Sequence, residues 1–394
     1  MSVSARRLLG LGVSVAVLAA ACAGGGTAPT AGTAGPAAGE PLLVGIITPL
    51  SGEVAIDGEL TRKGIDLAVE EINAGGGVNG RPIEVRIEDG ACDPAATTSA
   101  AQKLLTRDRV VVLEGAFCSS ATAAAIPLAE RAQVPFVSAL STAADLTEPG
   151  NPWFSRFAPT ESLMAAQATP ILVSELGIEK AAILTFNDDY GLSYADAYES
   201  ELRAAGVDVV SVENFGANTQ DFAPYITKIR SSGADTVFVA ADTGPEAAVF
   251  KQMAQLGLTD INKVSAQVAV SQAFIDLATA EAAEGIYATT PYVSGGSAPR
   301  NAAFVEAFGG KYPGEVPESD AAGGYITLYL FADALARSGA EGGQALQDAI
   351  RATDLETVRG RLTFDARGQG YAQFFIARIQ GGQITVAQEL TLQP

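Results

Sequence analysis

Residues 88–147 decide the fold, and they read EDGACDPAATTSAAQKLLTRDRVVVLEGAFCSSATAAAIPLAERAQVPFVSALSTAADLT. The apolar run Val110–Leu113 is short and uninterrupted, which is typical of a buried parallel strand. The run Ile83–Ile87, just before this stretch, alternates apolar and charged residues as a half-buried strand does. Helical patterns over Pro94–Thr106 and Ser119–Arg131 follow these two strands. Strands that alternate with helices at this spacing predict parallel βαβ units.

Polar residues stand where two of the predicted strands end. Cys118 lies at a strand-to-helix junction, so Ser119 and Ser120 fall in the cap and first turn, where backbone N–H groups lack partners. Such a helix end suits a carboxylate or another anion. The next apolar run, Val134–Val137, opens into Ser138–Thr142. Ligands bind at neighbouring strand ends of α/β sheets, so we predict a site here. The alternative role for Ser119 is plain helix capping.

A second series of alternating strands and helices follows Arg156. Its predicted strands are Ala181–Phe186, Val207–Val212, Thr236–Ala240 and Val264–Ala266, and its helices are Thr160–Leu176, Tyr190–Ala205, Phe222–Ser232 and Pro245–Leu256. Later helical patterns cover Asn301–Lys311, Asp320–Arg337 and Gln344–Arg351, and strand-like pieces cover Phe374–Ile379 and Ile384–Leu390. Two such series predict an α/β protein with two doubly wound parallel-sheet lobes.

The composition excludes several functional classes. The 394 residues carry a net charge of −20, with a pI near 4.4. Such a chain is unsuited to nucleic acid, which needs a basic surface, and to anionic lipid. It contains no histidine, the commonest general base and metal ligand. No G-x-S-x-G motif or spaced His/Cys set is found, so we predict no enzyme activity, no cofactor and no metal.

The N-terminus is typical of an export signal. Arg6 and Arg7 precede a short apolar run, Leu8–Ala21, which ends at Cys22. This arrangement resembles a bacterial lipoprotein signal, although Leu18 stands four rather than three residues before the cysteine. We predict a signal peptide over residues 1–21, lipidation of Cys22 and a flexible tether of small residues over 22–40. An ordinary cleaved secretory signal is the alternative.

Several segments in order resemble one known family. They are GIITPLSG (45–52), GIDLAVEEINAGGGVNGRPIEVRIEDGACDP (64–94), FCSSAT (117–122), STAADLT (141–147), NDDYG (187–191) and AEGIYATTPY (283–292). Together they are similar to the leucine-binding family, the substrate-binding proteins of ABC importers for branched-chain amino acids. The resemblance covers nearly all of the chain after the export signal.

The resemblance implies an architecture and a role. Residues 41–159 plus 290–364 would form lobe 1, and residues 160–289 plus 365–394 would form lobe 2, joined by a hinge of three crossovers. The protein would be exported and lipid-anchored. It would catch a small ligand between its lobes and deliver it to an ABC permease with its ATPase. The membrane would be reached through the lipid anchor only.

The resemblance also implies a ligand site. Ser119, Leu140, Ser141 and Thr142 match family residues that hold the α-carboxylate and α-amino groups of the ligand, and Tyr190 matches a tyrosine from the second lobe. For Tyr190 the alternative is a surface tyrosine. The family also has a disulfide at positions matching Cys92 and Cys118, which supports their pairing over the alternative of two unpaired buried thiols.

Five further positions depart from the family pattern. Asp57 and Asp320 replace aromatic residues, Gln267 stands near a glutamate that pairs with the ammonium group, and Asp242 and Thr243 lie where Gly and Tyr are common. A pocket that exchanges rings for carboxylates suits a polar or cationic ligand better than leucine. The alternative is that some of these acids are solvated rim residues.

Other uses of the same fold stay open. A sensory receptor would carry a transmembrane segment and a signalling domain after the binding domain, and no apolar run of about twenty residues is found before Pro394. A ligand-sensing module or a scavenger without a transporter remains the alternative function.

Overall fold

The computed structural model describes residues 39–52 and 54–392. The predicted signal peptide, Cys22 and nearly all of the predicted tether lie outside these described residues.

The first five strands of the chain form a parallel sheet in the order β2-β1-β3-β4-β5. Its strands are β1 (Leu42–Thr48), β2 (Ile83–Asp89), β3 (Val112–Glu114), β4 (Phe136–Ser138) and β5 (Phe154–Arg156). Val44 on β1 pairs with Val85 of β2 and Val112 of β3. The strand predicted from Val110 begins two residues later, because Arg109 closes the preceding helical turn with a left-handed backbone at φ 54°.

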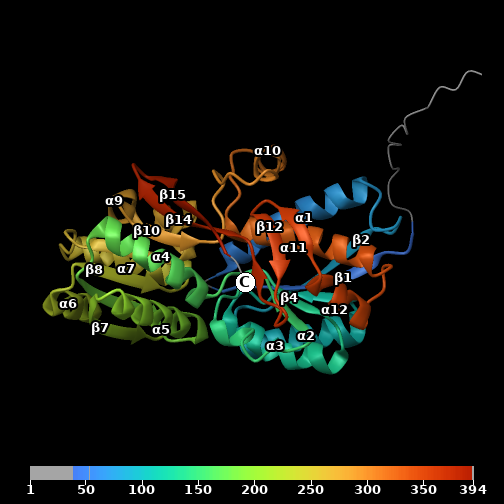
Figure 1. Ribbon diagram of the computed structural model, residues 1–394, viewed down its shortest axis with the longest axis horizontal. Helices are drawn as coiled ribbons and strands as arrows, with labels where there is room; N and C mark the ends of the chain where they lie inside the picture. The colour runs from blue at the N-terminus through green and yellow to red at the C-terminus, as the bar shows by residue number, and fades with distance from the viewer. Residues whose placement is uncertain (1–38, 53, 393–394) are drawn as a thin grey trace, which may run out of the picture. The chain divides into compact units, whose positions relative to one another are not determined.

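Helices cover both faces of this sheet, as Figure 1 shows. On one face lie α1 (Ala55–Ala74), α10 (Asn301–Lys311), α11 (Ser319–Arg337) and α12 (Gly343–Arg351); on the other lie α2 (Pro94–Lys103) with the π-turn η1 (Leu104–Asp108), and α3 (Ser119–Ala132). Side chains alternate along a strand, so Val112 enters the first core and Leu113 the second. The sheet is therefore doubly wound, as predicted.

Two glycines let α1 and α11 lie side by side (Figure 1). A Cβ on Gly64 would stand 1.9 Å from the carbonyl oxygen of Ala321, and one on Gly324 would stand 2.3 Å from that of Thr61. Only residues without a Cβ permit so close an approach of two backbones. The contact places the N-terminal ends of the two helices, with Asp57 and Asp320, at one edge of the sheet.

A seven-stranded sheet forms from the second series, in the order β15-β14-β10-β9-β8-β6-β7. Its strands are β6 (Lys180–Phe186), β7 (Asp208–Phe215), β8 (Thr236–Ala240), β9 (Asn262–Ser265), β10 (Tyr287–Thr290), β14 (Gln373–Gln380) and β15 (Gln383–Thr391). Strands β6 to β10 are parallel, whereas β14 and β15 form an antiparallel hairpin on β10. The prediction of parallel-sheet lobes is confirmed, with this hairpin as an addition.

Helices also cover both faces of the second sheet. One face carries α4 (Glu161–Leu176) and α5 (Asp189–Ala204); the other carries α6 (Ala223–Ser232), α7 (Thr243–Gln255), α8 (Gln272–Ala278) and α9 (Ala280–Ala283). Short 3₁₀ turns, η2 (Ala144–Leu146) and η3 (Gln267–Ala269), lie in loops that follow the strands. The helix predicted from Thr160 begins at Glu161, because the Thr160 hydroxyl caps it by accepting from Leu163 N.

The chain passes between the two large sheets three times, after β5, after β10 and before β14. Before the last passage it forms a small sheet of β11 (Asp354–Thr357), β12 (Gly360–Phe364) and β13 (Gly370–Tyr371), which the sequence analysis missed. The passages lie near the predicted lobe boundaries, which stay a prediction. No helix within the described residues is both long and apolar enough to span a membrane.

Candidate functional site

A cavity lies where the loops after β3 and β4 meet the starts of α5 and α7. Predicted ligand-binding residues line it: Ser119, Leu140, Thr142, Tyr190, Asp242 and Gln267. Phe117, Cys118, Asp188 and Val268 complete the lining and were not predicted as ligand residues. Because the lining comes from loops at the carboxyl ends of strands of both sheets, the site has the placement expected for α/β proteins. We call it the first cavity.

Ser119 and Thr142 contribute hydroxyl groups from the first sheet. Both residues are almost fully buried. Cys118 holds the N-cap position of α3, and the Ser119 hydroxyl accepts a hydrogen bond from the Ala143 N–H at 3.2 Å. Ser119 therefore ties α3 to the next loop rather than capping its own helix. The Thr142 side chain hydrogen-bonds to Glu161 at the start of α4.

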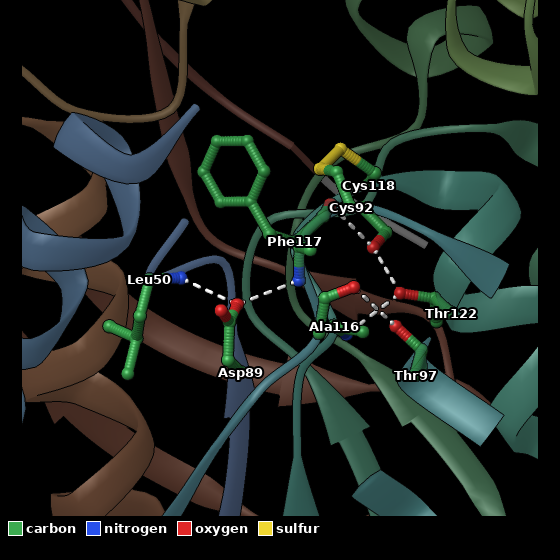
Figure 2. The surroundings of a disulfide bond; sticks show 11 residues. Leu50, Asp89, Cys92, Thr97, Ala116, Phe117, Cys118 and Thr122 are labelled. Atoms are coloured by element: carbon green, nitrogen blue, oxygen red, sulfur yellow. Dashed lines mark hydrogen bonds between the residues drawn. A yellow bond between two sulfur atoms is a disulfide. The ribbon is translucent and has the colours of Figure 1, made fainter. Parts of the chain in front are cut away.

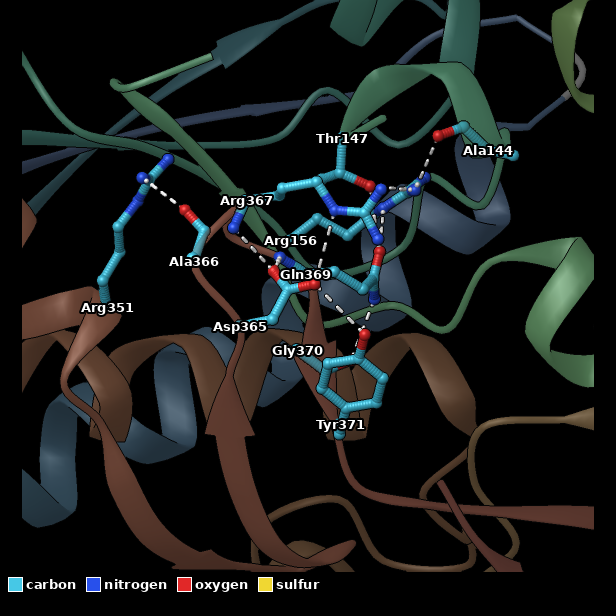
Figure 3. A network of polar contacts seen from close by, with 10 residues as sticks. All are labelled: Ala144, Thr147, Arg156, Arg351, Asp365, Ala366, Arg367, Gln369, Gly370 and Tyr371. Atoms are coloured by element: carbon cyan, nitrogen blue, oxygen red, sulfur yellow. Dashed lines mark hydrogen bonds and ion pairs between the residues drawn. The ribbon is translucent and has the colours of Figure 1, made fainter. Parts of the chain in front are cut away.

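Arg156 fixes the loop that carries Leu140 and Thr142, and Figure 3 shows its contacts with Ala144 and Thr147. This arginine, at the end of β5, is fully buried. Its guanidinium donates to the carbonyl oxygens of Ser141 at 3.2 Å and Ala144 at 3.3 Å, and also to that of Ala143. It donates further to the Thr147 hydroxyl at 2.6 Å. Burial lowers the pKa of Arg156 to about 9, so it remains charged at neutral pH.

Gln369, which lies between β12 and β13, completes this network. Its side-chain oxygen accepts from Arg156 Nε at 3.0 Å and from the Thr147 hydroxyl at 3.1 Å, while its amide donates to the Ala158 carbonyl at 2.9 Å. Arg156 and Gln369 thus link residues 141–147 and β5 to the segment before the last crossover (Figure 3). No local sequence signal indicates this role, because most arginines are exposed.

The predicted disulfide between Cys92 and Cys118 is present (Figure 2). It joins the loop after β2 to the start of α3, closing a sequence separation of 26 residues. In the chain-entropy model a loop of this length stabilises the folded state by about 3.5 kcal/mol. Since Cys118 lines the first cavity, the bond also limits the movement of one wall.

Phe117 precedes the disulfide residue Cys118, lines the same cavity and has a left-handed backbone at φ 72°. Its carbonyl oxygen accepts from the Ser141 hydroxyl at 2.9 Å, and that hydroxyl also bonds Thr122 Oγ1 at 2.7 Å. The Ser141 hydroxyl therefore stabilises this loop, and Ser141 does not line the cavity. Nearby, Asp89 accepts from the Leu50 and Ala91 N–H groups, both at 2.8 Å (Figure 2).

The second sheet contributes Tyr190, Asp242 and Gln267 to the first cavity. Tyr190 lies in the first turn of α5 and is 8% exposed. Its hydroxyl and the Gln267 side-chain oxygen are buried without a hydrogen-bond partner among the described residues. Buried polar atoms are normally paired, so these two are suited to a ligand or bound water.

A second cavity adjoins the first and shares Phe117, Gln267 and Val268 with it. Asp57 and Asp320 line it, together with Val270, Ser271, Glu318 and Ser319. Asp57 is 5% exposed and accepts a hydrogen bond from the Thr243 hydroxyl at 3.1 Å. Asp57 is therefore not a solvated rim residue. Its hydrogen bond with Thr243 joins α1 to α7. Thr243 itself lines neither cavity.

Two buried acids behind the cavities were missed by the sequence analysis. Burial raises the pKa of Glu161 to about 7, and it raises that of Glu246 well above its usual range. Glu246 accepts from the Ala241 N–H at 2.8 Å and from the Ser265 hydroxyl. Burial raises the pKa of Tyr190, and the charges of both acids raise it further. An acid near a helix start is usually exposed, so burial could not be inferred from local sequence.

Comparison with known proteins places the chain among solute-binding proteins. The model of the periplasmic binding protein family matches residues 41–383. An amino acid binding protein from Pseudomonas aeruginosa is 29% identical over 334 residues, which cover 83% of this chain and 87% of that protein.

Two solved structures have the same fold. The branched-chain amino acid transporter substrate binding protein LivJ from Streptococcus pneumoniae, in complex with isoleucine, has a TM-score of 0.83 and 27% identity, covering 90% of this chain and 100% of that one. A solute binding protein of an ABC transporter from Rhodopseudomonas palustris BisB5, in complex with 3,4-dihydroxybenzoic acid, has a TM-score of 0.80 and 25% identity, covering 89% and 97%.

Proposed function

The chain belongs to the periplasmic binding protein family, and from this premise we propose that it is the extracytoplasmic solute-binding protein of an ABC importer. Its ligand would be an amino acid or a related small polar molecule, held between two lobes. Its partners would be the permease and ATPase of that importer. The family consists of solute-binding proteins, and we propose no catalytic role for this chain.

The observation that carries this proposal is the composition of the first cavity. Ser119 and Thr142 supply buried hydroxyls beside the N-terminal end of α3, which favours a carboxylate. The Asp188 and Asp242 side chains and the Gln267 oxygen offer acceptors for an ammonium group. The α-carboxylate and α-amino groups of an amino acid would therefore meet opposite chemistries in one cavity.

The ligand's side chain would extend into the second cavity, and this cavity favours a polar ligand over leucine. An apolar side chain gains roughly 25 cal/mol per Å² by burial, but here it would strip water from Asp57, Glu318 and Asp320. A polar or cationic side chain would keep those groups hydrogen-bonded. An aromatic acid such as 3,4-dihydroxybenzoate lacks the ammonium group and would leave the acceptors of the first cavity unpaired.

Replacing Ser119 with alanine or Thr142 with valine should weaken binding of the preferred amino acid by roughly 1.5–3 kcal/mol each, the value of a hydrogen bond to a charged group. Isothermal titration calorimetry measures the change. Ser120→Ala is the matched control, since Ser120 follows Ser119 on α3 and lines neither cavity. Unchanged affinity in both site variants, with the empty proteins melting normally, would move the ligand elsewhere.

We also propose export and lipid anchoring through Cys22. The family name supports export, while the anchor rests on the sequence before residue 39 alone. The second candidate role is a sensor or scavenger that uses the same site. Permease and ATPase genes beside this one would favour import, whereas a neighbouring sensor kinase gene would favour signalling.

A further inference from the structure

Three carboxylic acids from one half of the molecule gather around the second cavity. Asp57 lies in the first turn of α1, Glu318 precedes α11, and Asp320 lies in the first turn of α11. The close packing of α1 on α11 at Gly64 and Gly324 brings these helix starts together. The described residues hold no group of three or more His, Cys, Asp or Glu side chains placed to hold a metal ion.

The acids are only partly compensated by their neighbours. Asp57 accepts from the Thr243 hydroxyl, and Glu318 accepts from the Gln272 N–H at 2.8 Å. Lys63 is the cation that acts on Glu318, but it pairs at 2.5 Å with Glu315, an acid outside the second cavity. Asp242, next to Thr243 in the chain, adds a further carboxylate on the side of the first cavity. Among the residues that line the second cavity, every charged one is an acid.

A separate observation points to a ligand in this cavity. Ser319 is 8% exposed, lines the cavity between the two acids Glu318 and Asp320, and its hydroxyl has no partner among the described residues. The buried Gln267 oxygen, on the opposite wall, also lacks a partner there. Both atoms are suited to accept hydrogen bonds from a donor that sits among the acids.

We propose that the second cavity binds a cationic group at the far end of an amino-acid side chain. The inference rests on the proposed function, because the first cavity must hold the amino-acid end. It narrows the ligand to α-amino acids with a second positive charge. A bound cation compensates the acids as protons do in the empty protein, so ligand and protons compete.

The electrostatics of the cluster agree with this competition. Burial raises the pKa of Asp57 to about 6 and that of Glu318 to about 7. Burial, followed by the charges of Asp57 and Glu318, raises the pKa of Asp320 well above its usual range. The empty cavity therefore holds protons near neutral pH. An arriving cation lowers these pKa values and releases protons, so its affinity rises with pH until the acids are ionised.

The test is calorimetric titration of the purified protein with L-arginine, L-glutamine and L-leucine. Titrations at pH 7 in phosphate and in Tris, whose ionisation enthalpies differ, count the protons released. We expect L-arginine to bind most tightly and to release about one proton, and its affinity to fall roughly tenfold from pH 7.5 to pH 5.5. L-leucine should show neither effect.

Variants locate the protons. Asp320→Asn and, as an independent variant, Glu318→Gln should each reduce the proton release and weaken L-arginine more than L-glutamine. Glu306→Gln is the control, an exposed acid on α10 that lies outside both cavities. Tightest binding of L-leucine or L-glutamine, or L-arginine binding without proton release, would overturn the inference while leaving the amino-acid site intact. Failure of all three amino acids would instead count against the proposed function.

Discussion

Replacing Arg156 with methionine is expected to lower the free energy of unfolding by roughly 4 kcal/mol, because the change leaves several buried groups without their donor. These include the carbonyl oxygens of Ser141 and Ala144 and the hydroxyl of Thr147. Methionine fills much of the space but donates nothing. The affinity for the ligand should fall as well, since the loop over residues 141–147 loses its fixed position. Urea unfolding and calorimetric titration measure the two effects.

Arg351→Met provides a matched control for this prediction. Arg351 also donates to backbone carbonyl groups, at 2.7 Å to Asn151 and 3.0 Å to Ala366, but it does not touch residues 141–147 (Figure 3). Its replacement should lower stability while leaving ligand affinity nearly unchanged. Equal loss of affinity in the two variants, or none in Arg156→Met, would show that Arg156 does not position the ligand loop.

Replacing Glu114 with glutamine is expected to stabilise the protein at high pH and not at low pH. Glu114 ends β3, is 2% exposed, and its Oε2 atom lacks a partner among the described residues. Burial raises its pKa from 4.5 to about 8. Between these values the folded state keeps a proton that the unfolded chain loses, so stability falls as the pH rises. Glutamine has no charge and removes this dependence.

The size of the effect follows from the shift in pKa. Each pKa unit corresponds to about 1.4 kcal/mol. From pH 4.5 to above pH 8, the free energy of unfolding of the variant should therefore rise by roughly 3–5 kcal/mol relative to that of the parent. Urea unfolding from pH 5 to pH 9 measures this. Glu175→Gln, which replaces an exposed acid on α4, is the control. If the stabilities of Glu114→Gln and the parent stay parallel over this range, the carboxyl is not held protonated.

The fold was predictable because its pattern is local. The strands predicted at 83–87 and 110–113 are each followed by a helical period, and the structure places them with β4 in one parallel sheet. The small sheet of β11 to β13 escaped prediction, since its strands are short and two of them begin at a glycine, Gly360 and Gly370. Such strands lack the length that distinguishes a sheet from a loop.

The candidate site was only partly predictable. Ser119 and Thr142 follow the ends of β3 and β4, and the topology of that sheet alone brings those ends together, whereas Tyr190 follows β6 of the other sheet. The burial of Arg156, Glu161 and Glu246 depends on contacts distant in sequence, and charged residues are mostly exposed. Glu114 did carry a signal, because it directly continues the uninterrupted apolar run of a buried strand. The meeting of Asp57 with Thr243 required both sheets in place.

One calorimetric titration shows whether the first cavity holds the amino and carboxylate groups of an amino acid. The purified protein is titrated with a panel of α-amino acids and with 3,4-dihydroxybenzoate as a carboxylate without an ammonium group. We expect that an α-amino acid binds in a one-to-one complex and that the aromatic acid does not bind. Binding of the aromatic acid, with no heat from any α-amino acid, would contradict it.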